Sequence, residues 1–361
     1  MELLKKTVAS IEDPDWRAGE KAQQRLNLLT KPQGSLGKLE DMLLSLAAIQ
    51  GNPLPVLGDK AVMVMVGDHG VVAEGVSAFP QEVTRQMVLN FLQQGAAINV
   101  LAHHAGARVI ISDVGMAAEP IQHPDLIQRR VRSGTRNMAR EAAMTEAEAI
   151  AAIEVGIELV NQEIDRGTGL IATGEMGIGN TTPSTAILAC ISGKKVEDLT
   201  GRGTGLDDAG LIHKQKIIRQ SLQINRPDPD HPLEVLHKLG GLEIAAITGI
   251  ILGAAARRTP VVLDGLISAA AALIACRMNP KCRHYLFASH LSQEPGHRIM
   301  LEEIGLEPVL YLDMRLGEGT GAVLVFHLLE AAVKIIHQMA SFEEAGVSQR
   351  TDAYYTKECS D

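Results

Sequence analysis

Short, continuously apolar runs recur along the chain, and each is followed by a polar or glycine-containing turn. The runs lack the alternation of apolar and polar residues that marks a sheet exposed on one face. They therefore predict parallel strands that are covered on both faces. We expect six strands, at residues 61–67, 108–112, 169–173, 260–263, 284–289 and 308–312.

Helical patterns separate the expected strands. The segment that begins at Thr145 opens with a threonine followed three residues later by Glu148, which fits a capping box. Six repeats of strand and then helix predict an α/β fold with a mostly parallel six-stranded sheet and right-handed crossovers. The expected helices are at residues 83–105, 145–164, 207–224, 242–257, 266–277 and 320–339.

The two ends of the chain differ from its middle. Residues 1–50 contain helical segments and a turn at 30–37 but no strand, and no strand follows the last helix. We expect residues 1–50 and 330–361 to form a small helical subdomain and residues 51–329 to form the α/β domain. The last residues, 348–361, are polar and are expected to be frayed.

Two glutamates stand among glycines directly after expected strands. Glu175 lies in residues 173–182 (TGEMGIGNTT) and Glu318 in residues 316–321 (LGEGTG). Glycine lets backbone amides approach a ligand closely, and a parallel sheet binds ligands beyond the carboxyl ends of its strands. Two such loops in one α/β pattern predict an active site that holds a phosphate-bearing substrate beside a proton acceptor.

The segment 174–182 resembles an anion cradle that opens a helix, with accessible amides and the hydroxyls of Thr181 and Thr182. A tight strand–helix turn capped by threonine is the alternative. The segment matches neither a Walker loop nor a dinucleotide fingerprint. A second glycine-rich loop, residues 201–205 (GRGTG), precedes a helix that carries Lys214. Arg202 or Lys214 could bind a phosphate, or each could be a surface charge.

Further polar residues follow the expected strands. Six of them suggest a metal site at first sight, but their histidine spacing is not that of a helical His-x-x-x-His pair and no cysteine is near. We favour side chains that bind ligand or cap helices, with a metal site as the alternative; they are Asp68, His69, Asp113, Asp264, His290 and His297. Phe79, Gln86 and Met87 would suit a flat heteroaromatic ligand, or would simply form a loop and one helix face.

Composition excludes some classes of function. A net charge of −9 with 3% aromatic residues argues against a nucleic-acid surface. The apolar stretches 244–256 and 260–276 are a short helix and a segment interrupted by Asp264, so no membrane span is expected. Four cysteines without a C-x-x-C pair indicate no disulfide framework and favour the cytoplasm.

Five ordered motifs make the chain similar to one enzyme family. They are residues 30–37 (TKPQGSLG), 67–70 (GDHG), 173–182, 201–205 and 316–321. The chain resembles the nicotinate-nucleotide–dimethylbenzimidazole phosphoribosyltransferases from about residue 20 to about residue 340. The resemblance implies transfer of phosphoribose from nicotinate mononucleotide to 5,6-dimethylbenzimidazole. The products are α-ribazole 5′-phosphate, for the lower loop of cobalamin, and nicotinate.

The resemblance also implies roles for individual residues. Glu318 would be the general base and Glu175 a second catalytic residue, and Glu175 and Asp264 would lie near the ribose and nicotinate. Phe79, Gln86, Met87 and Leu316 would line the benzimidazole pocket. The nucleotide phosphate would be held by Gly174, Met176, Gly177, Ile178, Gly179, Asn180, Thr181, Gly203 and Lys214.

At the level of the whole molecule, the resemblance implies a Rossmann-like sheet with a small helical bundle built from both chain ends. It further implies a homodimer in which the partner's small domain helps to close each site, with no metal or other cofactor. Two other functions compete. One is a metal-assisted phosphoesterase that uses Asp68, His69, Asp113 and His290, and the other is a non-catalytic module that senses nicotinate mononucleotide.

Overall fold

The computed structural model describes residues 1–203 and 205–348 and divides the chain into two compact units. The first unit contains Met1–Pro14 and Leu57–His327, and the second contains Asp15–Val56 and the segment from Leu328 onward. The polar end at 349–361, with Cys359, lies outside the described residues.

Among the described residues, six strands form one sheet in which every neighbouring pair is parallel. The strand order is β3-β2-β1-β4-β5-β6, so consecutive connections change direction between β1 and β4. Both central strands are apolar and buried along most of their length. The bounds are β1 Asp59–Gly67, β2 Arg108–Gly115, β3 Leu126–Gln128, β4 Thr168–Met176, β5 Val261–Leu263 and β6 Leu286–Ala288. The α/β fold class predicted from the sequence is confirmed.

One expected strand is wrong, and one observed strand was not predicted. Residues 308–312 form only an isolated bridge from Leu310 to His290. The side chains of Tyr311 and Leu312, which follow, are exposed to solvent. The sheet nevertheless has six strands, because the short strand β3, which was not expected, pairs with β2. Residues 284 and 285 belong to the short helix η2 (Pro280–Tyr285) rather than to β6.

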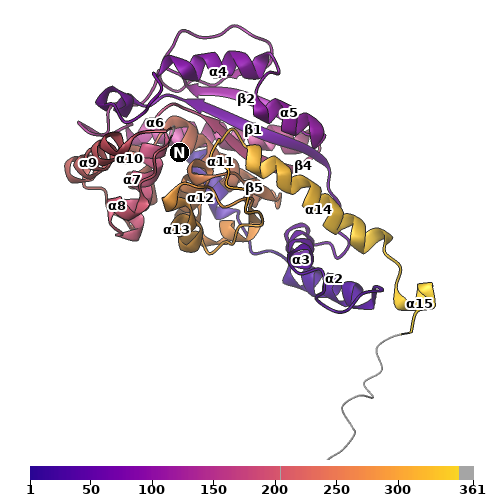
Figure 1. Ribbon diagram of the computed structural model, residues 1–361. Helices are drawn as coiled ribbons and strands as arrows, with labels where there is room; N and C mark the ends of the chain where they lie inside the picture. Colours follow the sequence, from indigo (N-terminus) through magenta and orange to yellow (C-terminus); the bar gives the residue numbers. More distant parts are fainter. Residues whose placement is uncertain (204, 349–361) are drawn as a thin grey trace, which may run out of the picture. The chain divides into compact units, whose positions relative to one another are not determined.

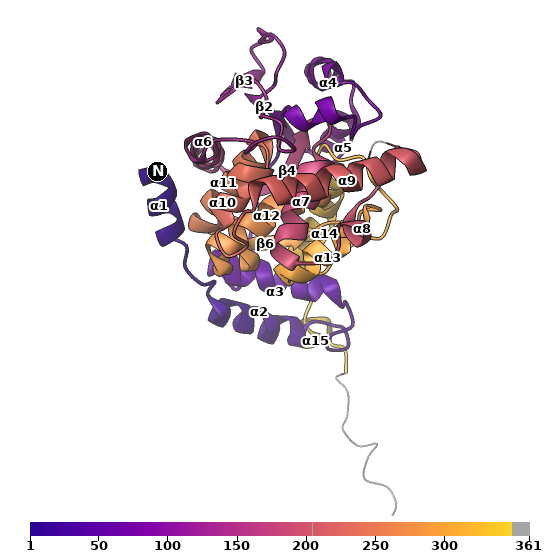
Figure 2. The ribbon, with the colours of Figure 1, turned by 90° about the vertical axis from the view of Figure 1, so that its left-hand side faces the viewer.

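Helices cover both faces of the sheet. Figures 1 and 2 show α4 (Glu82–Leu92) and α5 (Ala97–His104) on one side and α11 (Leu242–Ala256) and α12 (Leu266–Met278) on the other. Helix α11 packs on β1, β2 and β4 and also on α6 (Glu146–Asp165). The capping box of Thr145 and Glu148 at the start of α6 is confirmed.

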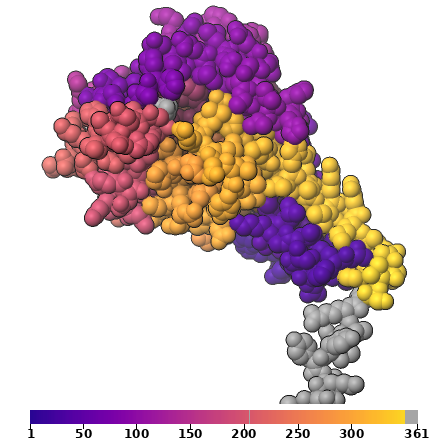
Figure 3. All heavy atoms as spheres, viewed as in Figure 1, coloured from indigo at the N-terminus to yellow at the C-terminus, as the bar shows by residue number. Residues whose placement is uncertain are grey.

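The expected helix at 83–105 is wrong as a single element. It is divided into α4 and α5, because Gln94 adopts a left-handed backbone with φ 62° and Gly95 follows it. The other helices that cover the sheet unit are α1 Glu2–Ala9, α7 Thr181–Ser192, α8 Val196–Leu199, α9 Asp208–Asn225, α10 Pro232–Leu239, α13 Pro295–Ile304 and the short helix η1 Gly70–Glu74. Helix α13 packs against α7 and α8, and the segments 181–225 and 280–320 adjoin on the face shown in Figure 3.

The second unit joins segments from both parts of the chain. Its helices are α2 (Trp16–Leu28), α3 (Lys38–Gln50), the end of α14 (Thr320–Gln338) and α15 (Phe342–Ala345). One apolar core joins α2, the residue that follows it, α3 and α14, and it consists of Ala22, Leu26, Leu29, Leu43, Ala47, Ala332 and Ile336. Unlike the expected subdomain, this unit does not include residues 1–14, because α1 packs against α6 and α11.

Helix α14 is the one described helix that is long and apolar enough to cross a membrane. Half of its most apolar window is buried. The core helix of a soluble protein has the same length and composition, so this property is weak evidence for a membrane span.

Candidate active site

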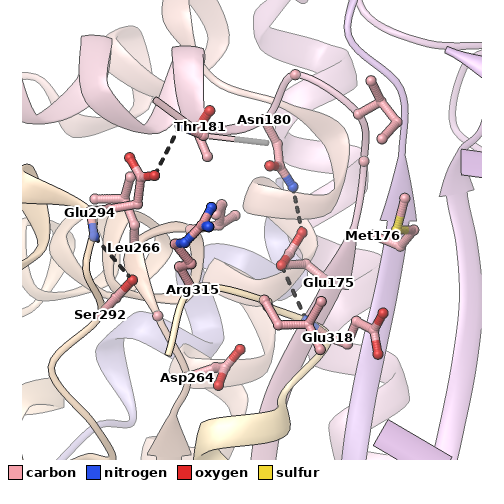
Figure 4. A pocket seen from close by; sticks show the side chains of 18 of the residues that line it. Glu175, Met176, Asn180, Thr181, Asp264, Leu266, Ser292, Glu294, Arg315 and Glu318 are labelled. Atoms are coloured by element: carbon pink, nitrogen blue, oxygen red, sulfur yellow. Dashed lines mark hydrogen bonds between the residues drawn. The ribbon is translucent and has the colours of Figure 1, made fainter. Parts of the chain in front are cut away.

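A cavity of about 440 Å³ lies in the sheet unit beyond the carboxyl ends of β4, β5 and β6. Both glycine-flanked glutamates are on its wall. The sequence placed its candidate residues at this edge of the sheet, and the structure brings most of them together (Figure 4). The lining includes Phe79, Met87, Glu175, Met176, Gly177, Ile178, Gly179, Asn180, Thr181, Gly203, Asp264, His290, Ser292, Glu294, Arg315, Leu316 and Glu318.

Glu175 stands near the end of β4, level with Met65 of β1. Its Oε2 accepts a hydrogen bond from the Asn180 side chain, and its Oε1 accepts one from the backbone N–H of Glu318 at 3.4 Å. Figure 4 shows the carboxyl group pointing toward both partners. Burial raises the pKa of Glu175 to about 8, and the charge of Asp264 acts in the same direction. Glu175 is therefore mostly protonated at neutral pH.

The loop around Glu318 has a backbone that only a few residue types adopt easily. Gly317, Glu318 and Gly319 have φ angles of 90°, 64° and 93°. A non-glycine residue in the left-handed region is uncommon, and such residues cluster at functional sites. Asp264 at the end of β5 fixes the loop by accepting backbone N–H groups from Gly319 at 3.0 Å and Gly321 at 2.8 Å.

The Glu318 carboxyl group lies against the first turn of α5, where its Oε2 accepts the N–H of Ile98 at 3.3 Å. Its Oε1 receives no hydrogen bond from the described part of the chain. Burial raises the pKa of Glu318, the Ile98 N–H acts against that shift, and the charge of Asp264 adds to it. A carboxylate with a raised pKa and one unpaired oxygen on a cavity wall is suited to accept a proton.

The Asp264 side chain is the third carboxyl group of the cavity wall with a raised pKa, and it contacts the same loop. Burial raises its pKa to about 7, although the N–H groups of Gly319, Gly321 and Ala322 favour its charged form. Because Glu175 and Asp264 both titrate near neutrality, the acidic wall carries less negative charge than its formal count of carboxyl groups.

Lys214, Thr181 and Gly203 meet at the other end of the cavity. Lys214 is fully buried, and its ammonium group donates to Thr181 Oγ1 at 2.7 Å and to the Gly201 carbonyl at 3.4 Å. Burial lowers the pKa of Lys214 to about 8, and Glu294 acts against that shift. Because Thr181 begins α7, the amides and positive dipole end of that helix face the same place.

Two predicted cradle residues make contacts that the sequence did not indicate. The Gly203 N–H donates to Glu294 Oε1 at 3.0 Å, so a phosphate would have to displace or share this bond. Gly174 does not line the cavity. A Cβ there would lie 2.5 Å from the Glu318 carbonyl oxygen, so the absence of a side chain lets the Glu318 loop pack on β4.

Three of the four residues expected to bind an aromatic base line the cavity, and one does not. Phe79, Met87 and Leu316 line the cavity, and Phe79 and Leu316 are about half exposed, at 49% and 58%. Gln86 points out to solvent and is not on the wall.

The other strand-end residues are held by protein partners. The His69 ring pairs with Glu243 at 2.6 Å, Asp68 accepts the N–H of Ala117, and Asp113 binds Arg130. His290 and His297 are buried, and burial lowers their pKa values to about 4 and about 3. No three His, Cys, Asp or Glu side chains in residues 1–203 and 205–348 are grouped to hold a metal ion.

Sequence reasoning missed Ser292, Glu294 and Arg315 as cavity residues. Glu294 and Ser292 follow the end of β6, and Arg315 directly precedes the Leu-Gly-Glu-Gly motif. The sequence signal for all three is their closeness to a strand end or to a glycine-rich motif.

The family model described as "Phosphoribosyltransferase" matches residues 11–347, which include every cavity residue. The chain belongs to this phosphoribosyltransferase family. The resemblance stated from five sequence motifs is thus confirmed, as is the expectation that the chain is an enzyme.

Relatives of this phosphoribosyltransferase extend over its whole length. The chain is 57% identical to the nicotinate-nucleotide–dimethylbenzimidazole phosphoribosyltransferase of Desulforamulus reducens over 350 residues, which are 97% of the chain and 100% of the relative. It is 56% identical to the enzyme of that name from Geotalea uraniireducens, covering 97% and 99%. The crystal structure of CobT from Thermus thermophilus superimposes with a TM-score of 0.89 at 50% identity, covering 92% of this chain and 100% of that one.

Proposed function

We propose that this phosphoribosyltransferase moves the phosphoribosyl group of nicotinate mononucleotide to a ring nitrogen of 5,6-dimethylbenzimidazole. The products are α-ribazole 5′-phosphate and nicotinate. The observation that carries the proposal is the full-length similarity, above 50% identity, to enzymes that are named for this reaction. The cavity supports it, because an anion cradle and a carboxyl group with a raised pKa border the same cavity.

The chemistry places the difficult proton on the incoming base. The bond from C1′ to the pyridinium nitrogen breaks, and its electron pair neutralises that nitrogen, so nicotinate leaves without being protonated. A benzimidazole nitrogen forms the new bond to C1′, and the N–H on its other nitrogen becomes acidic. Attack from the face opposite the leaving group inverts C1′ from β to α.

We assign Glu318 as the acceptor of that proton. Its Oε1 has no partner among the described residues, while the bond from Ile98 to Oε2 holds the carboxylate in place. General base catalysis by a positioned carboxylate typically contributes about 10²–10⁴-fold in rate. Glu175 mainly positions Glu318, because its Oε1 accepts the Glu318 backbone N–H. Its own pKa of about 8 leaves Glu175 neutral beside the base.

The anion cradle would hold the nucleotide phosphate. Lys214 supplies a buried ammonium group, Thr181 begins a helix, and the loop 177–180 supplies amides. Phe79, Met87 and Leu316 would contact the benzimidazole, and Phe79 and Leu316 are exposed enough to be covered by an apolar ligand. Holding both rings in line adds a proximity contribution with a ceiling near 7–11 kcal/mol.

We extend the proposal to assembly and location on the basis of the family resemblance alone. The enzyme would act as a homodimer in the cytoplasm, without a metal or another cofactor. Light scattering of the purified protein at assay concentration tests the dimer, since a monomer that turns over at full rate contradicts it. Full turnover after exhaustive chelation is expected, whereas activity that only Zn²⁺ or Mg²⁺ restores contradicts the absence of a metal.

The decisive assay for the reaction supplies nicotinate mononucleotide with and without 5,6-dimethylbenzimidazole. We expect nicotinate release only when the base is present, together with one equivalent of an α-configured riboside phosphate, identified by the NMR coupling of its anomeric proton. Release of inorganic phosphate would support the phosphoesterase instead. Nucleotide binding without any product would support the sensor module.

A further inference from the structure

Arg315 is the one lysine or arginine on the cavity wall within residues 1–203 and 205–348. Its side chain forms no hydrogen bond or ion pair with the described residues, and Figure 4 shows its guanidinium group extending into the cavity among Glu294, Asn180 and Glu175. The other cation, Lys214, is buried behind the wall and bound to Thr181. The cavity thus offers one open cationic group in addition to the cradle.

The backbone that carries Arg315 is held in place although the side chain is not. The Gln293 N–H donates to the carbonyl of Met314 at 3.1 Å, and the Gln293 side chain donates to Asp313 Oδ1 at 2.6 Å. Glu318, three residues further along the same loop, is fixed by Asp264 through its neighbour Gly319. The backbone position from which the Arg315 side chain projects is therefore fixed, and it is close in sequence to the proposed base.

The substrate of the proposed reaction carries two anionic groups, a phosphate and the carboxylate of its pyridine ring. The cradle at Lys214 and Thr181 suits the phosphate. The rest of the wall carries the carboxyl groups of Glu175, Asp264 and Glu294 and no other lysine or arginine among the described residues, so it offers a second anion no favourable charge. His290 does not supply one, because burial lowers its pKa to about 4. A guanidinium group matches a carboxylate in shape as well as in charge.

We infer that Arg315 binds the pyridine carboxylate and is the residue that distinguishes nicotinate mononucleotide from nicotinamide mononucleotide. This inference rests on the proposed function. A carboxamide of the same shape offers a neutral oxygen and an NH₂ group, which the guanidinium group repels as a second donor. Discrimination between the two substrates would then be lost when Arg315 is replaced, while the chemistry at C1′ is kept.

The test compares wild type, Arg315→Gln, Arg315→Lys and the matched control Arg298→Gln, an exposed arginine of α13 that is not on the wall. Each is assayed for kcat/KM with nicotinate mononucleotide and with nicotinamide mononucleotide, with 5,6-dimethylbenzimidazole saturating. For Arg315→Gln we expect a loss of about 10- to 100-fold with the nicotinate substrate, from removal of a charge-assisted bond. The nicotinamide substrate should lose less than about threefold, and Arg315→Lys should fall between.

Two results would overturn the inference. Equal losses with both substrates would assign Arg315 to the phosphate, which the two nucleotides share, and unchanged kinetics in Arg315→Gln would remove it from recognition altogether. Competition by free nicotinate against the nucleotide gives a second readout, since its inhibition should weaken in Arg315→Gln and persist in Arg298→Gln. Failure of the proposed function would instead show as absence of the riboside product from wild type itself.

Discussion

Replacement of the buried Lys214 by methionine should stabilise the free enzyme at neutral pH while weakening its hold on phosphate. The ammonium group is fully buried and makes hydrogen bonds to one hydroxyl and one carbonyl, with no carboxylate in direct contact among the described residues. Its pKa falls from 10.5 to about 8. At about 1.4 kcal/mol per unit, that drop of roughly 2.5 units corresponds to about 3 kcal/mol of cost for the charged form.

The sign follows from proton binding. Between pH 8 and pH 10.5 the unfolded chain keeps the Lys214 proton longer than the folded enzyme does, so this group makes wild type gain stability as pH rises. Below pH 8 the penalty is present in full. Methionine has a similar length and no charge, and it gives up two hydrogen bonds, together worth about 1–2 kcal/mol because the bond to the Gly201 carbonyl is long. We therefore expect Lys214→Met to be about 1–2 kcal/mol more stable than wild type at pH 7, with the gain lost by pH 10.5.

Urea unfolding of wild type, Lys214→Met and the control Lys216→Met at pH 7 and pH 10 measures this difference. Lys216 is an exposed neighbour on the same helix, so its replacement should leave both values within about 0.5 kcal/mol. Addition of nicotinate mononucleotide at 100 times its Kd should stabilise wild type by about 2.7 kcal/mol, and the same concentration should stabilise Lys214→Met far less. A variant that is less stable than wild type at pH 7, yet binds the nucleotide as well, would refute the reasoning.

Three further predictions concern the sheet unit. His69→Leu should cost about 3–5 kcal/mol because it leaves the buried Glu243 carboxylate without its partner, and the double change with Glu243→Leu should recover most of that loss in urea unfolding. Gly249→Ala should lower the melting temperature, since a Cβ there would collide with the backbone oxygen of Ile153 in α6, and the cost of about 1–3 kcal/mol exceeds the gain of about 1 kcal/mol in helix propensity. Arg136 lowers the pKa of Glu148 to about 2, so wild type should lose roughly 1 kcal/mol as pH falls from 4.5 to 2, a loss that acid titration of Glu148→Gln should not show.

The sheet and its ligand-binding edge could be predicted because they depend on local patterns. Continuous apolar runs identified β1, β2 and β4, and the polar turns after them identified where the cavity lies. The apolar run at 308–312 has the same composition as these strands but pairs with the sheet through a single bridge. Composition alone does not show that the chain leaves the sheet after this bridge. The three-residue strand β3 is too short to give a periodic signal.

The contacts that set the electrostatics of the site could not be predicted, because they join residues far apart in the chain. Ile98 and Glu318 are 220 residues apart, and His69 and Glu243 are 174 apart. Nothing in the sequence showed that Glu294 would take the Gly203 amide, or that Gln86 would face solvent while Met87 lines the cavity. These pairings depend on loop paths that local propensity does not determine.

Turnover of Glu318→Gln tests the assignment of the proton acceptor most directly. The amide has the same shape but cannot take a proton from the azole. We expect single-turnover formation of the riboside phosphate to fall by about 10²–10⁴-fold while the Kd for nicotinate mononucleotide changes less than about threefold. A rate within about threefold of wild type, with binding equally intact, would show that another group removes the proton.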